Sequence, residues 1–537
     1  MACTPINIDK LEELLFEHPD KTFTSQLCSG LREGFMTGIE NVPALSYECT
    51  NNLTARADPA SVSRLLQSEI DKGYVIGPFD TPPFSVFRIS PLGLAEGKYS
   101  GKKRLIVDLS APHDKPGVPS LNELIDKEAF SMSYIRIDDA TMELKRVGSS
   151  AFMCKFDIMD AFKQVPLHPS VVPWHGVKWE GKYYFFVRLV FGCRSSPKLF
   201  DALSQAICWI AEHKYGIKFI LHLLDDFFTV DDGEFSALRT MSIMTLIFNT
   251  LRIPLAKHKT LGPVQELEYL GIMLNSKELM AFLPTDKRIR ISQKLSEVLA
   301  KKSVTKQVLL SLLGHLSFAG RVVLPGRSFV SHLLQLASTV PKLHYHVAIN
   351  SDCRMELAMW DSFLQSWNGV HLFLNSEVTS AADLQIYTDA SSKVGFGGYF
   401  RGEWFSDCWP AELNMNNRSD LSMALLELYP IVVAAMLWGG KWSQKRIRFN
   451  CDNEATVHII NKGRASSKCQ TINKLMRRLT LLAMRYNFII LARFLPGVHN
   501  GIADSLSRFH FQKFRQLAPA AQQLRTQCPL YCEVTQI

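Results

Sequence analysis

Residues 218–230 read KFILHLLDDFFTV, and the architecture of the first half of the chain follows from this stretch. Two adjacent aspartates, Asp225 and Asp226, interrupt an apolar run whose composition favours strands on both sides. A tight turn at the aspartates, between two strands, keeps both apolar arms available for a core. An isolated Asp-Asp pair is more often a plain surface turn, so its meaning depends on the rest of the chain.

A second apolar strand also ends in an aspartate. Residues 151–159 read AFMCKFDIM, with Asp157 near the end of the run. Carboxylates in apolar surroundings are costly unless they bind cations or accept hydrogen bonds. If the strands bring Asp157 beside Asp225, the pair can hold two Mg²⁺ ions, which stabilise the attacking and leaving oxygens in phosphoryl transfer. The alternative is a strand-end aspartate without a chemical role.

The order of these motifs resembles that of the reverse transcriptases over about residues 60–340. KFDIMDAF, FVRLVFGCRSSPKLF and LLDDFF resemble palm motifs of that family, and KHKTLGP and EYLGIML resemble the two motifs that follow. The resemblance implies that Asp157 and Asp225 are metal ligands and that Asp226 is an accessory carboxylate. Leu223 stands where most members have Tyr, which affects positioning of the primer end more than chemistry.

The resemblance also assigns residues that hold the nucleotide. Phe162 would crowd the sugar 2′ carbon and exclude ribonucleotides, although an aromatic residue there is also a natural core residue. Arg104 and Lys98 would contact the triphosphate of the incoming nucleotide, since phosphates are bound by cations. The alternative for either cation is an ordinary solvated side chain.

Three further assignments follow from the same resemblance. Gly192 would allow close backbone approach to the template base or nucleotide, with Phe191 in the adjacent pocket position. Lys259 would protonate the leaving pyrophosphate as a general acid. The alternative for Lys259 is an ordinary loop lysine.

Four more carboxylates lie on separate predicted elements after residue 384, where QIYTDASSKVGFGGYF begins an independent α/β domain. They are Asp389 in YTDAS, Glu427 in LLELYP, Asp452 in CDNEA and Asp504 in IADSLSR. Carboxylates from different elements have little reason to converge except to bind metal. Each one alone has a plainer interpretation as a turn, surface-helix or capping residue.

In order and type these four motifs resemble the ribonuclease H fold. The resemblance implies that all four carboxylates hold two Mg²⁺ ions, with Mn²⁺ as an alternative metal, and that the RNA strand of an RNA:DNA hybrid is cut there. His499 lies where many members have a product-release histidine, in a variable loop. Pro430, inside the helix of Glu427, predicts a late helix start or a kink.

Composition and charge narrow the class of protein. The chain has 537 residues, 47% of them hydrophobic, and a net charge of +9, which excludes global disorder and a single compact domain. Residues 441–515 carry fifteen Lys or Arg and three acidic residues, which favours a polyanionic partner. Twelve scattered cysteines without a CxxC pair predict reduced thiols in the cytoplasm or nucleus. No apolar run predicts a membrane span, and the first residues do not resemble a secretory leader.

Five segments carry a narrower resemblance, to the reverse transcriptase and RNase H polyprotein segment of DIRS-type, tyrosine-recombinase retroelements, over about residues 17–520. They are GPFDTPPFSVFRISPLG, DLSAPH, GRVVLPGRSF, LLELYPIVVAA and LPGVHNGIADSLSRF. The sequence shows no recombinase Arg, His-x-x-Arg and Tyr set, no Asp-Ser/Thr-Gly protease motif and no integrase zinc-binding set. Integration is therefore expected to use a recombinase on a separate chain.

Local patterns predict helices after Asp58, from Pro197 to about Tyr215 and opening near Asp160, and a short buried strand in KKRLIVDLS. Residues 286–340 have a helical period, with breaks expected at Gly314, Gly320 and Pro325 to Gly326.

The predicted fold is an α+β polymerase right hand followed by an α/β RNase H-like domain with a mixed sheet. The expected parts are an N-terminal extension (1–55), interleaved fingers and palm (56–285), thumb (286–345), connection (346–382), RNase H-like domain (383–510) and C-terminal tail (511–537). The expected function is an RNA-directed DNA polymerase with a fused RNase H. Its expected partners are an RNA template, a DNA primer, an RNA:DNA hybrid and deoxynucleoside triphosphates, without a membrane. The alternatives are a non-catalytic nucleic-acid-binding protein derived from a retroelement and a nuclease with an idle polymerase domain.

Overall fold

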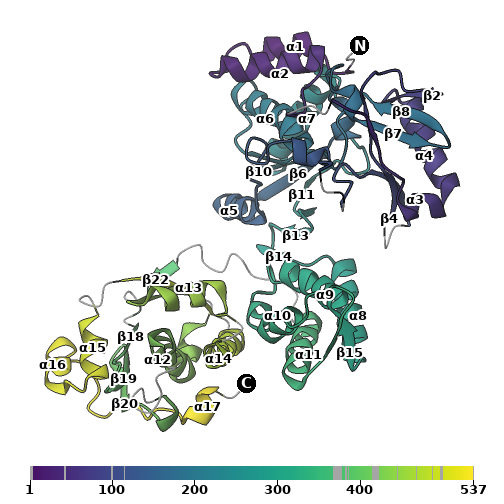
Figure 1. The fold of residues 1–537 in the computed structure, drawn as a ribbon. Helices are drawn as coiled ribbons and strands as arrows, with labels where there is room; N and C mark the ends of the chain where they lie inside the picture. The colour runs from purple at the N-terminus through teal and green to yellow at the C-terminus, as the bar shows by residue number, and fades with distance from the viewer. Residues whose placement is uncertain are drawn as a thin grey trace. The chain divides into compact units, whose positions relative to one another are not determined.

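The structure is a computed structural model of the chain. It describes residues 4–40, 44–97, 101–113, 115, 117–366, 378–380, 384, 386–413, 422–443, 445–466, 469–486, 488–495 and 500–535. Lys98 and His499 lie outside the described residues. The chain divides into two compact units, Met1–Leu270 and Gly271–Ile537, and each is described by itself (Figure 1).

A four-stranded antiparallel sheet, named the palm sheet here after the predicted palm motifs on it, carries the first group of aspartates; its strands β6, β10 and β11 are labelled in Figure 1. Its order is β11-β6-β10-β9, with the strands β6 (Ala151–Asp157), β9 (Ile220–Leu223), β10 (Asp226–Asp232) and β11 (Leu261–Val264). β10 pairs with both β6 and β9 in antiparallel register. The two predicted strands on either side of Asp225, and the tight turn between them, are therefore confirmed.

Two helices pack on this sheet, α6 (Ser196–His213) against β9 and α7 (Glu234–Thr250) against β6 and β10. Pro197 lies in the first turn of α6, where its missing N–H group is not needed for a helical hydrogen bond. The helix predicted from Pro197 to about Tyr215 is confirmed. The helix predicted to open near Asp160 is only a 3₁₀ turn, η2 (Ala161–Gln164), which follows a left-handed Asp160 with φ 49°.

Two further sheets belong to the first unit. The five-stranded sheet has the order β1-β3-β7-β8-β2, with β1 (Tyr47–Glu48), β2 (Val75–Phe79), β3 (Arg88–Ile89), β7 (Gly176–Trp179) and β8 (Lys182–Phe186). β4 (Leu92–Glu96) and β5 (Lys103–Val107) form an antiparallel ribbon. KKRLIVDLS, predicted as a buried strand, does form β5, but Arg104 and Ile106 are exposed because β5 pairs with β4 alone.

The remaining helices of the first unit extend its hydrophobic core. They are α1 (Ile8–Leu14), α2 (Lys21–Glu33), α3 (Leu53–Ala57), α4 (Pro59–Asp71) and α5 (Ile137–Val147). α4 confirms the helix predicted after Asp58, whose side chain accepts a hydrogen bond from the Ser61 N–H at 3.2 Å and so caps the helix. Leu11, Leu31 and Val62 are fully or almost fully buried in the same core cluster as the palm strands.

The second unit begins with the hairpin β13 (Ile272–Asn275) and β14 (Met280–Phe282), and a group of helices follows. These are α8 (Thr285–Leu299), α9 (Lys306–Ala319), η4 (Leu324–Ser328), α10 (Ser331–Ser338) and α11 (Ser351–Ser366), beside the ribbon β15 (Ser303–Thr305) and β16 (His346–Ala348). The predicted break at Gly314 is wrong. α9 runs through Gly314 because Leu312, Leu313 and Leu316 are buried on either side of it.

Two three-stranded sheets form the centre of the C-terminal domain. β18 (Ile386–Ala390), β19 (Gly395–Phe400) and β20 (Glu403–Cys408) are antiparallel, and β17 (Val378–Ser380), β21 (Arg446–Cys451) and β22 (Ile489–Phe494) are parallel. β18 contacts β21, so the two sheets are neighbours. Both strand directions of the predicted mixed sheet are present, divided between two sheets.

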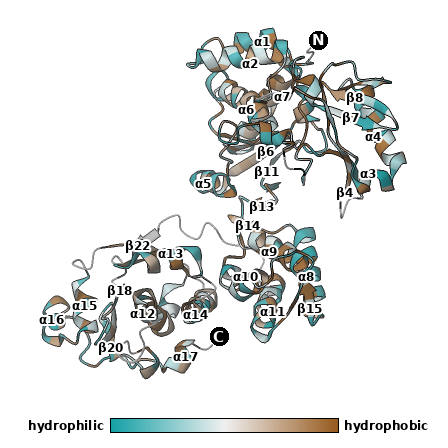
Figure 2. Ribbon diagram, in the orientation of Figure 1, coloured by the Kyte–Doolittle hydropathy of each residue, from teal (hydrophilic) through white to brown (hydrophobic). Residues whose placement is uncertain are grey.

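Helix α12 (Met423–Trp438) is the core element of this domain. Thirteen of the sixteen residues of α12 are buried. Helices such as α1, α4 and α8 differ from it, because they carry both hydrophilic and hydrophobic residues (Figure 2). Among the described residues, one helical stretch, Met423–Trp442, is long and apolar enough to cross a membrane, but 78% of its most apolar window is buried inside the protein. Pro430 lies well inside α12, which excludes the late helix start.

The helices around α12 are α13 (Glu454–Lys462), α14 (Gln470–Tyr486), α15 (Gly501–Ser507), α16 (Phe511–Leu517) and α17 (Tyr531–Thr535). The residues after 510 pack on the same domain. The Phe514 ring lies 5.1 Å from that of Trp404, the Tyr531 ring stacks 6.3 Å from that of Tyr429, and Val534 is fully buried.

Candidate active sites

The three aspartates of the first unit meet at one end of the palm sheet. Asp157, the last residue of β6, is the register partner of Asp226, the first residue of β10. Asp225 lies in the turn before β10, and its carbonyl oxygen accepts a hydrogen bond from the Ile158 N–H at 3.2 Å. Three carboxylates from two separate segments are thus held together by strand pairing, as the sequence predicts.

The electrostatics of this group favour a bound cation. Burial raises the pKa of Asp225, and the neighbouring Asp157 and Asp226 raise it further. Burial also raises the pKa of Asp226, although Lys155, whose ammonium lies 3.2 Å from the Asp226 carboxylate, opposes this shift. A hard divalent cation such as Mg²⁺ prefers oxygen ligands and would relieve the repulsion between these neighbouring carboxylates.

Lys259 lies directly on this group. Its Nζ donates to both carboxylate oxygens of Asp157, each at 2.9 Å. The hydrogen bond to Asp157 raises the pKa of Lys259, so the ammonium is charged at neutral pH. About half of the Lys259 side chain is exposed, which leaves it accessible to a substrate.

The two predicted pocket aromatics contact each other. The rings of Phe162 and Phe191 stack with centroids 4.6 Å apart. Phe162 is only 6% exposed and also packs in the palm core, whereas Phe191 is 61% exposed. The two rings come from different motifs and stack on each other, and only the Phe191 ring is exposed to solvent.

Gly192 needs to be glycine. Its φ is 91°, and a Cβ atom there would lie 3.3 Å from the carbonyl oxygen of Val107, at the end of β5. Asn122 donates to the Gly192 carbonyl at 2.9 Å and fixes this loop. Arg104 lies on the exposed face of β5, three residues before Val107.

The four carboxylates of the second unit also converge. Glu427 and Asp452 have carboxylate oxygens within 4.8 Å of each other, in a group that includes the Cys451 thiol. Asp389, on β18, accepts a hydrogen bond from the Ser507 hydroxyl at 2.6 Å, which places helix α15 and its Asp504 against that strand. Arg508 donates to Asp504 at 2.6 Å.

Burial disfavours ionisation of the carboxyl groups in this second group. It raises the pKa of Glu427 to about 9, and the charges of Asp389 and Asp452 add to the shift. It raises the pKa of Asp389 to about 6, opposed by the hydrogen bond from Ser507 and reinforced by Asp452 and Asp504. Such mutual destabilisation of buried carboxylates is relieved by a divalent cation, so the donor set fits Mg²⁺ or Mn²⁺.

Four contacts of the predicted site residues were not expected from the sequence. They involve Lys155, Asn122, Ser507 and Arg508. The spacing in the sequence could have predicted two of these contacts. Lys155 is two residues from Asp157, on the same face of a strand, and Arg508 is four residues from Asp504, on the same side of a helix. Asn122 and Ser507 act through tertiary packing, which spacing alone does not predict.

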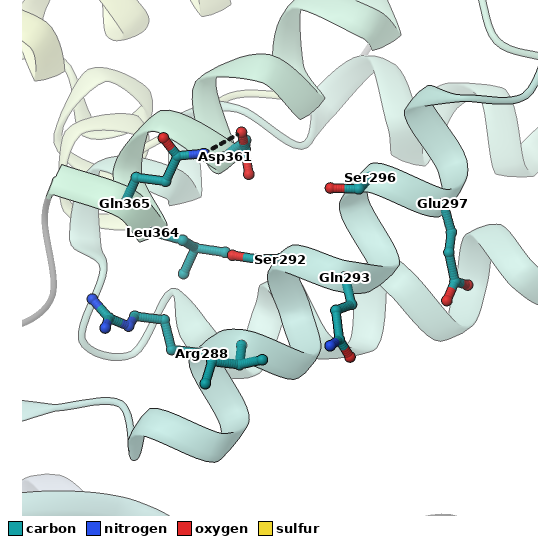
Figure 3. A pocket seen from close by; sticks show the side chains of 9 residues that line it. Arg288, Ser292, Gln293, Ser296, Glu297, Asp361, Leu364 and Gln365 are labelled. Atoms are coloured by element: carbon teal, nitrogen blue, oxygen red, sulfur yellow. Dashed lines mark hydrogen bonds between the residues drawn. The ribbon is translucent and has the colours of Figure 1, made fainter.

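A separate hollow lies between α8 and α11 of the second unit (Figure 3). Its volume is about 650 Å³, and its lining includes Arg288, Gln293, Glu297 and Asp361. None of the predicted site residues lines it.

Comparison with known proteins points to one family for the first unit. Residues 92–274 match the family model described as reverse transcriptase (RNA-dependent DNA polymerase). The chain is 21% identical over 444 residues to Polyprotein P3 of Commelina yellow mottle virus, covering 78% of this chain and 20% of that protein. It is also 21% identical over 539 residues to the retrovirus-related Pol polyprotein from transposon opus of Drosophila melanogaster, covering 95% of this chain and 49% of that protein. The chain thus spans about half or less of these relatives.

Solved structures agree on the fold. The foamy viral protease–reverse transcriptase dRH in complex with double-stranded DNA is similar with a TM-score of 0.52 and 16% identity, covering 91% of this chain and 82% of that one. A foamy viral protease–reverse transcriptase in complex with an RNA/DNA hybrid is similar with a TM-score of 0.50 and 15% identity, covering 91% of this chain and 63% of that one. The predicted right-hand fold of a polymerase is therefore confirmed. Residues 92–274 therefore resemble a reverse transcriptase domain, and the chain as a whole is similar to part of a viral polyprotein and to part of a retrovirus-related Pol polyprotein from a transposon.

Proposed function

We propose that the chain is an RNA-directed DNA polymerase with a fused ribonuclease H, which copies retroelement RNA into DNA and degrades the RNA strand of the hybrid. One observation carries the proposal. Strand pairing sets Asp157 opposite Asp226, with Asp225 beside them, inside the segment that matches the reverse transcriptase family.

In the polymerase step, the primer 3′-hydroxyl attacks the α-phosphate of a deoxynucleoside triphosphate and pyrophosphate leaves. Asp157 and Asp225 would hold two Mg²⁺ ions, with Asp226 as an accessory carboxylate. When bound, the metals neutralise charge on the phosphates and stabilise the attacking and leaving oxygens. Lys259 Nζ carries a proton that it can donate to pyrophosphate.

The nucleotide would be held by residues around this group. Arg104 and Lys98 would contact the triphosphate as cations. Phe162, braced by Phe191, would crowd the sugar 2′ carbon and disfavour ribonucleotides. Gly192 would let the backbone approach the template base or nucleotide closely.

In the nuclease step, water attacks a phosphodiester of the RNA strand, the bond between phosphorus and the 3′ oxygen breaks, and the 3′ oxygen leaves and takes up a proton. Asp389, Glu427, Asp452 and Asp504 would hold two Mg²⁺ ions, with Mn²⁺ as a substitute. The basic surplus of residues 441–515 would contact the hybrid backbone without reading its sequence.

We also propose a DIRS-type element as the source, with the recombinase on a separate chain. The five segments quoted above support this assignment. The place of action proposed is a reducing compartment, the cytoplasm or nucleus, from the scattered cysteines of the sequence, which form no CxxC pair.

Primer extension tests the polymerase. A labelled DNA primer on an RNA template is incubated with deoxynucleoside triphosphates and Mg²⁺, using the wild type and Asp225→Asn. We expect extension by the wild type alone. Nucleic-acid binding without extension by either protein would favour the non-catalytic alternative.

Cleavage of a labelled RNA:DNA hybrid tests the nuclease in the same preparations. We expect the wild type and Asp225→Asn to cut the RNA strand, and Asp452→Asn to leave it intact. Equal cleavage by Asp452→Asn would remove Asp452 from the nuclease site. Cleavage without extension would favour a nuclease with an idle polymerase domain.

A further inference from the structure

The turn that carries Asp225 is held from behind by helix α6. Leu224 has a φ of 55°, a left-handed conformation that is unfavourable for a residue with a branched side chain. Ser204 of α6 donates its hydroxyl proton to the Leu224 carbonyl oxygen at 2.8 Å, and Ser204 is fully buried. The strained turn therefore has a fixed partner outside its own hairpin.

A second contact joins α6 to β9, the strand that leads into this turn. His222 Nε2 lies 3.1 Å from Asp201 Oδ1, and both side chains are less than one-fifth exposed, at 18% and 15%. Gln205 donates to the other carboxylate oxygen of Asp201 at 2.7 Å. Burial opposes ionisation of Asp201, but the hydrogen bonds from His222 and Gln205 outweigh it and lower the pKa of this carboxyl. Asp201 is thus a carboxylate that accepts a hydrogen bond from His222.

The other ring nitrogen of His222 contacts a thiol. Cys208 Sγ lies 3.3 Å from His222 Nδ1, and burial raises the pKa of Cys208, so the thiol keeps its proton at neutral pH. A thiol that donates to Nδ1 leaves the ring proton on Nε2, where Asp201 accepts it.

These contacts come from one face of α6. Asp201, Ser204 and Cys208 are spaced three and four residues apart, the spacing of neighbours on a helix surface. On the neighbouring strand β10, the uncharged ring of Phe227, the register partner of His222, stacks on the His222 ring with centroids 5.9 Å apart. Glu212, also on α6, interacts with His222 through charge alone.

We propose that Asp201, Ser204 and His222 are positioning residues of the polymerase site, which clamp β9 and its turn against α6 and so orient Asp225 toward Asp157. The proposal rests on the polymerase function proposed above. The turn is held from two directions, by α6 at the Leu224 carbonyl and by β6 through the hydrogen bond from the Ile158 N–H to the Asp225 carbonyl. Releasing the α6 side would let the Asp225 carboxylate move relative to Asp157.

Primer extension by the full chain tests this clamp. In His222→Leu we expect kcat to fall about tenfold and the Mg²⁺ concentration for half-maximal rate to rise, because a shift of about 1 Å in a reacting group can lower a rate about a hundredfold. The KM for the nucleotide should change less than kcat. His222→Gln, whose amide can donate to Asp201, should restore most of the rate. His213→Leu makes the same change at the exposed end of α6 and should behave as wild type.

A binding measurement separates the clamp from overall activity. Mn²⁺ is titrated into full-length protein that carries Asp389→Asn and Asp452→Asn, and free Mn²⁺ is followed by electron paramagnetic resonance. We expect His222→Leu and Ser204→Ala to weaken Mn²⁺ binding at the remaining site, with the melting temperature of Ser204→Ala lowered by no more than a few degrees.

The outcomes separate the two proposals. Unchanged kcat, metal dependence and Mn²⁺ affinity in both His222→Leu and Ser204→Ala would overturn the clamp. Weaker Mn²⁺ binding in those variants, together with no extension by the wild type, would leave the clamp standing and remove the polymerase function. Extension by the wild type with a kcat loss in His222→Leu and rescue by His222→Gln supports both.

Discussion

Arg477 of α14 and Glu356 of α11 form a fully buried ion pair, with 1% and 0% of their side chains exposed. Glu356 also accepts hydrogen bonds from the N–H groups of His332 and Leu333, each at 3.1 Å. Arg477 donates to the Ser328 carbonyl at 3.1 Å. Within the second unit, the pair therefore joins the helices that follow β14 to the α/β domain at the C-terminal end.

Removal of the arginine alone should be costly. Arg477→Met leaves Glu356 buried without its cation, and we expect a loss of about 3–5 kcal/mol in the free energy of unfolding of this unit. Arg477→Met with Glu356→Leu should recover most of that loss, because neither side chain is then an unpaired buried charge. Urea unfolding, with hydrogen exchange of α11 and α14, measures both effects.

Arg485→Met is the matched control for this prediction. Arg485 lies near the exposed end of the same helix, so its replacement should leave unfolding unchanged. An equal loss in the single and double variants would show that packing around Arg477, and not the stranded charge, determines stability.

Lys259 should compete with cations for Asp157. In Lys259→Met we expect half-maximal primer extension at a lower Mg²⁺ concentration, because the ammonium no longer occupies both Asp157 oxygens. We also expect kcat to fall by about 100-fold or more, the usual effect of losing a general acid. Steady-state kinetics over a Mg²⁺ series measures both. Lys257→Met, at an exposed position two residues earlier, is the control, and a fall in kcat without a shift in Mg²⁺ dependence would contradict the competition.

Phe162 should control selection of the sugar. Phe162→Ala opens space beside the position proposed for the 2′ carbon, and we expect discrimination against ATP relative to dATP to fall by up to about 100-fold. The ratio of kcat/KM values for the two nucleotides measures it. Phe191→Leu, which keeps an apolar neighbour against Phe162, should give a smaller loss. An unchanged ratio of kcat/KM values in Phe162→Ala would show that Phe162 packs in the core and does not select the sugar.

Glu427 should make the metal-free protein less stable as the pH rises. Its pKa is about 9 in the fold against an ordinary value of 4.5, so the folded state retains a proton that the unfolded state releases. The stability from this group is fully present below about pH 4.5 and is lost progressively up to about pH 9. Asp389, with a pKa of about 6, adds the same sign of dependence from 3.8 to 6.

Melting temperatures in EDTA at pH 6 and pH 8.5 check this prediction. The wild type should lose stability between the two values, and Glu427→Gln, which cannot ionise, should lose less. Addition of Mg²⁺ should restore the wild type mainly at pH 8.5. A pH dependence that is the same in Glu427→Gln would show that other groups cause it.

The parts of the fold that depend on local pattern were predictable. The hairpin around Asp225 follows from two apolar arms on either side of a polar turn, and α6 follows from Pro197 and the apolar period after it. Convergence of Asp157 with Asp226 follows once those strands are known to pair. The roles assigned to these residues remain predictions.

The rest depended on packing between distant segments. Gly314 signals a break in the sequence, but buried leucines around it keep α9 continuous. Arg477 lies 121 positions from Glu356, and only the tertiary fold shows that they pair. The clamp of Ser204 on Leu224 was equally hidden, because a serine inside a helix has no pattern that identifies its acceptor.

The burial of α12 has a consequence for synthesis of the protein. Its partners β18 and β19 precede it in the chain, but α14 and α17, which also contact it, emerge later from the ribosome. Until they arrive, a nascent chain displays an apolar helix with the length and composition of a membrane span. The apolar surface of α12 is therefore expected to be covered completely only after residues 470–535 have been synthesised.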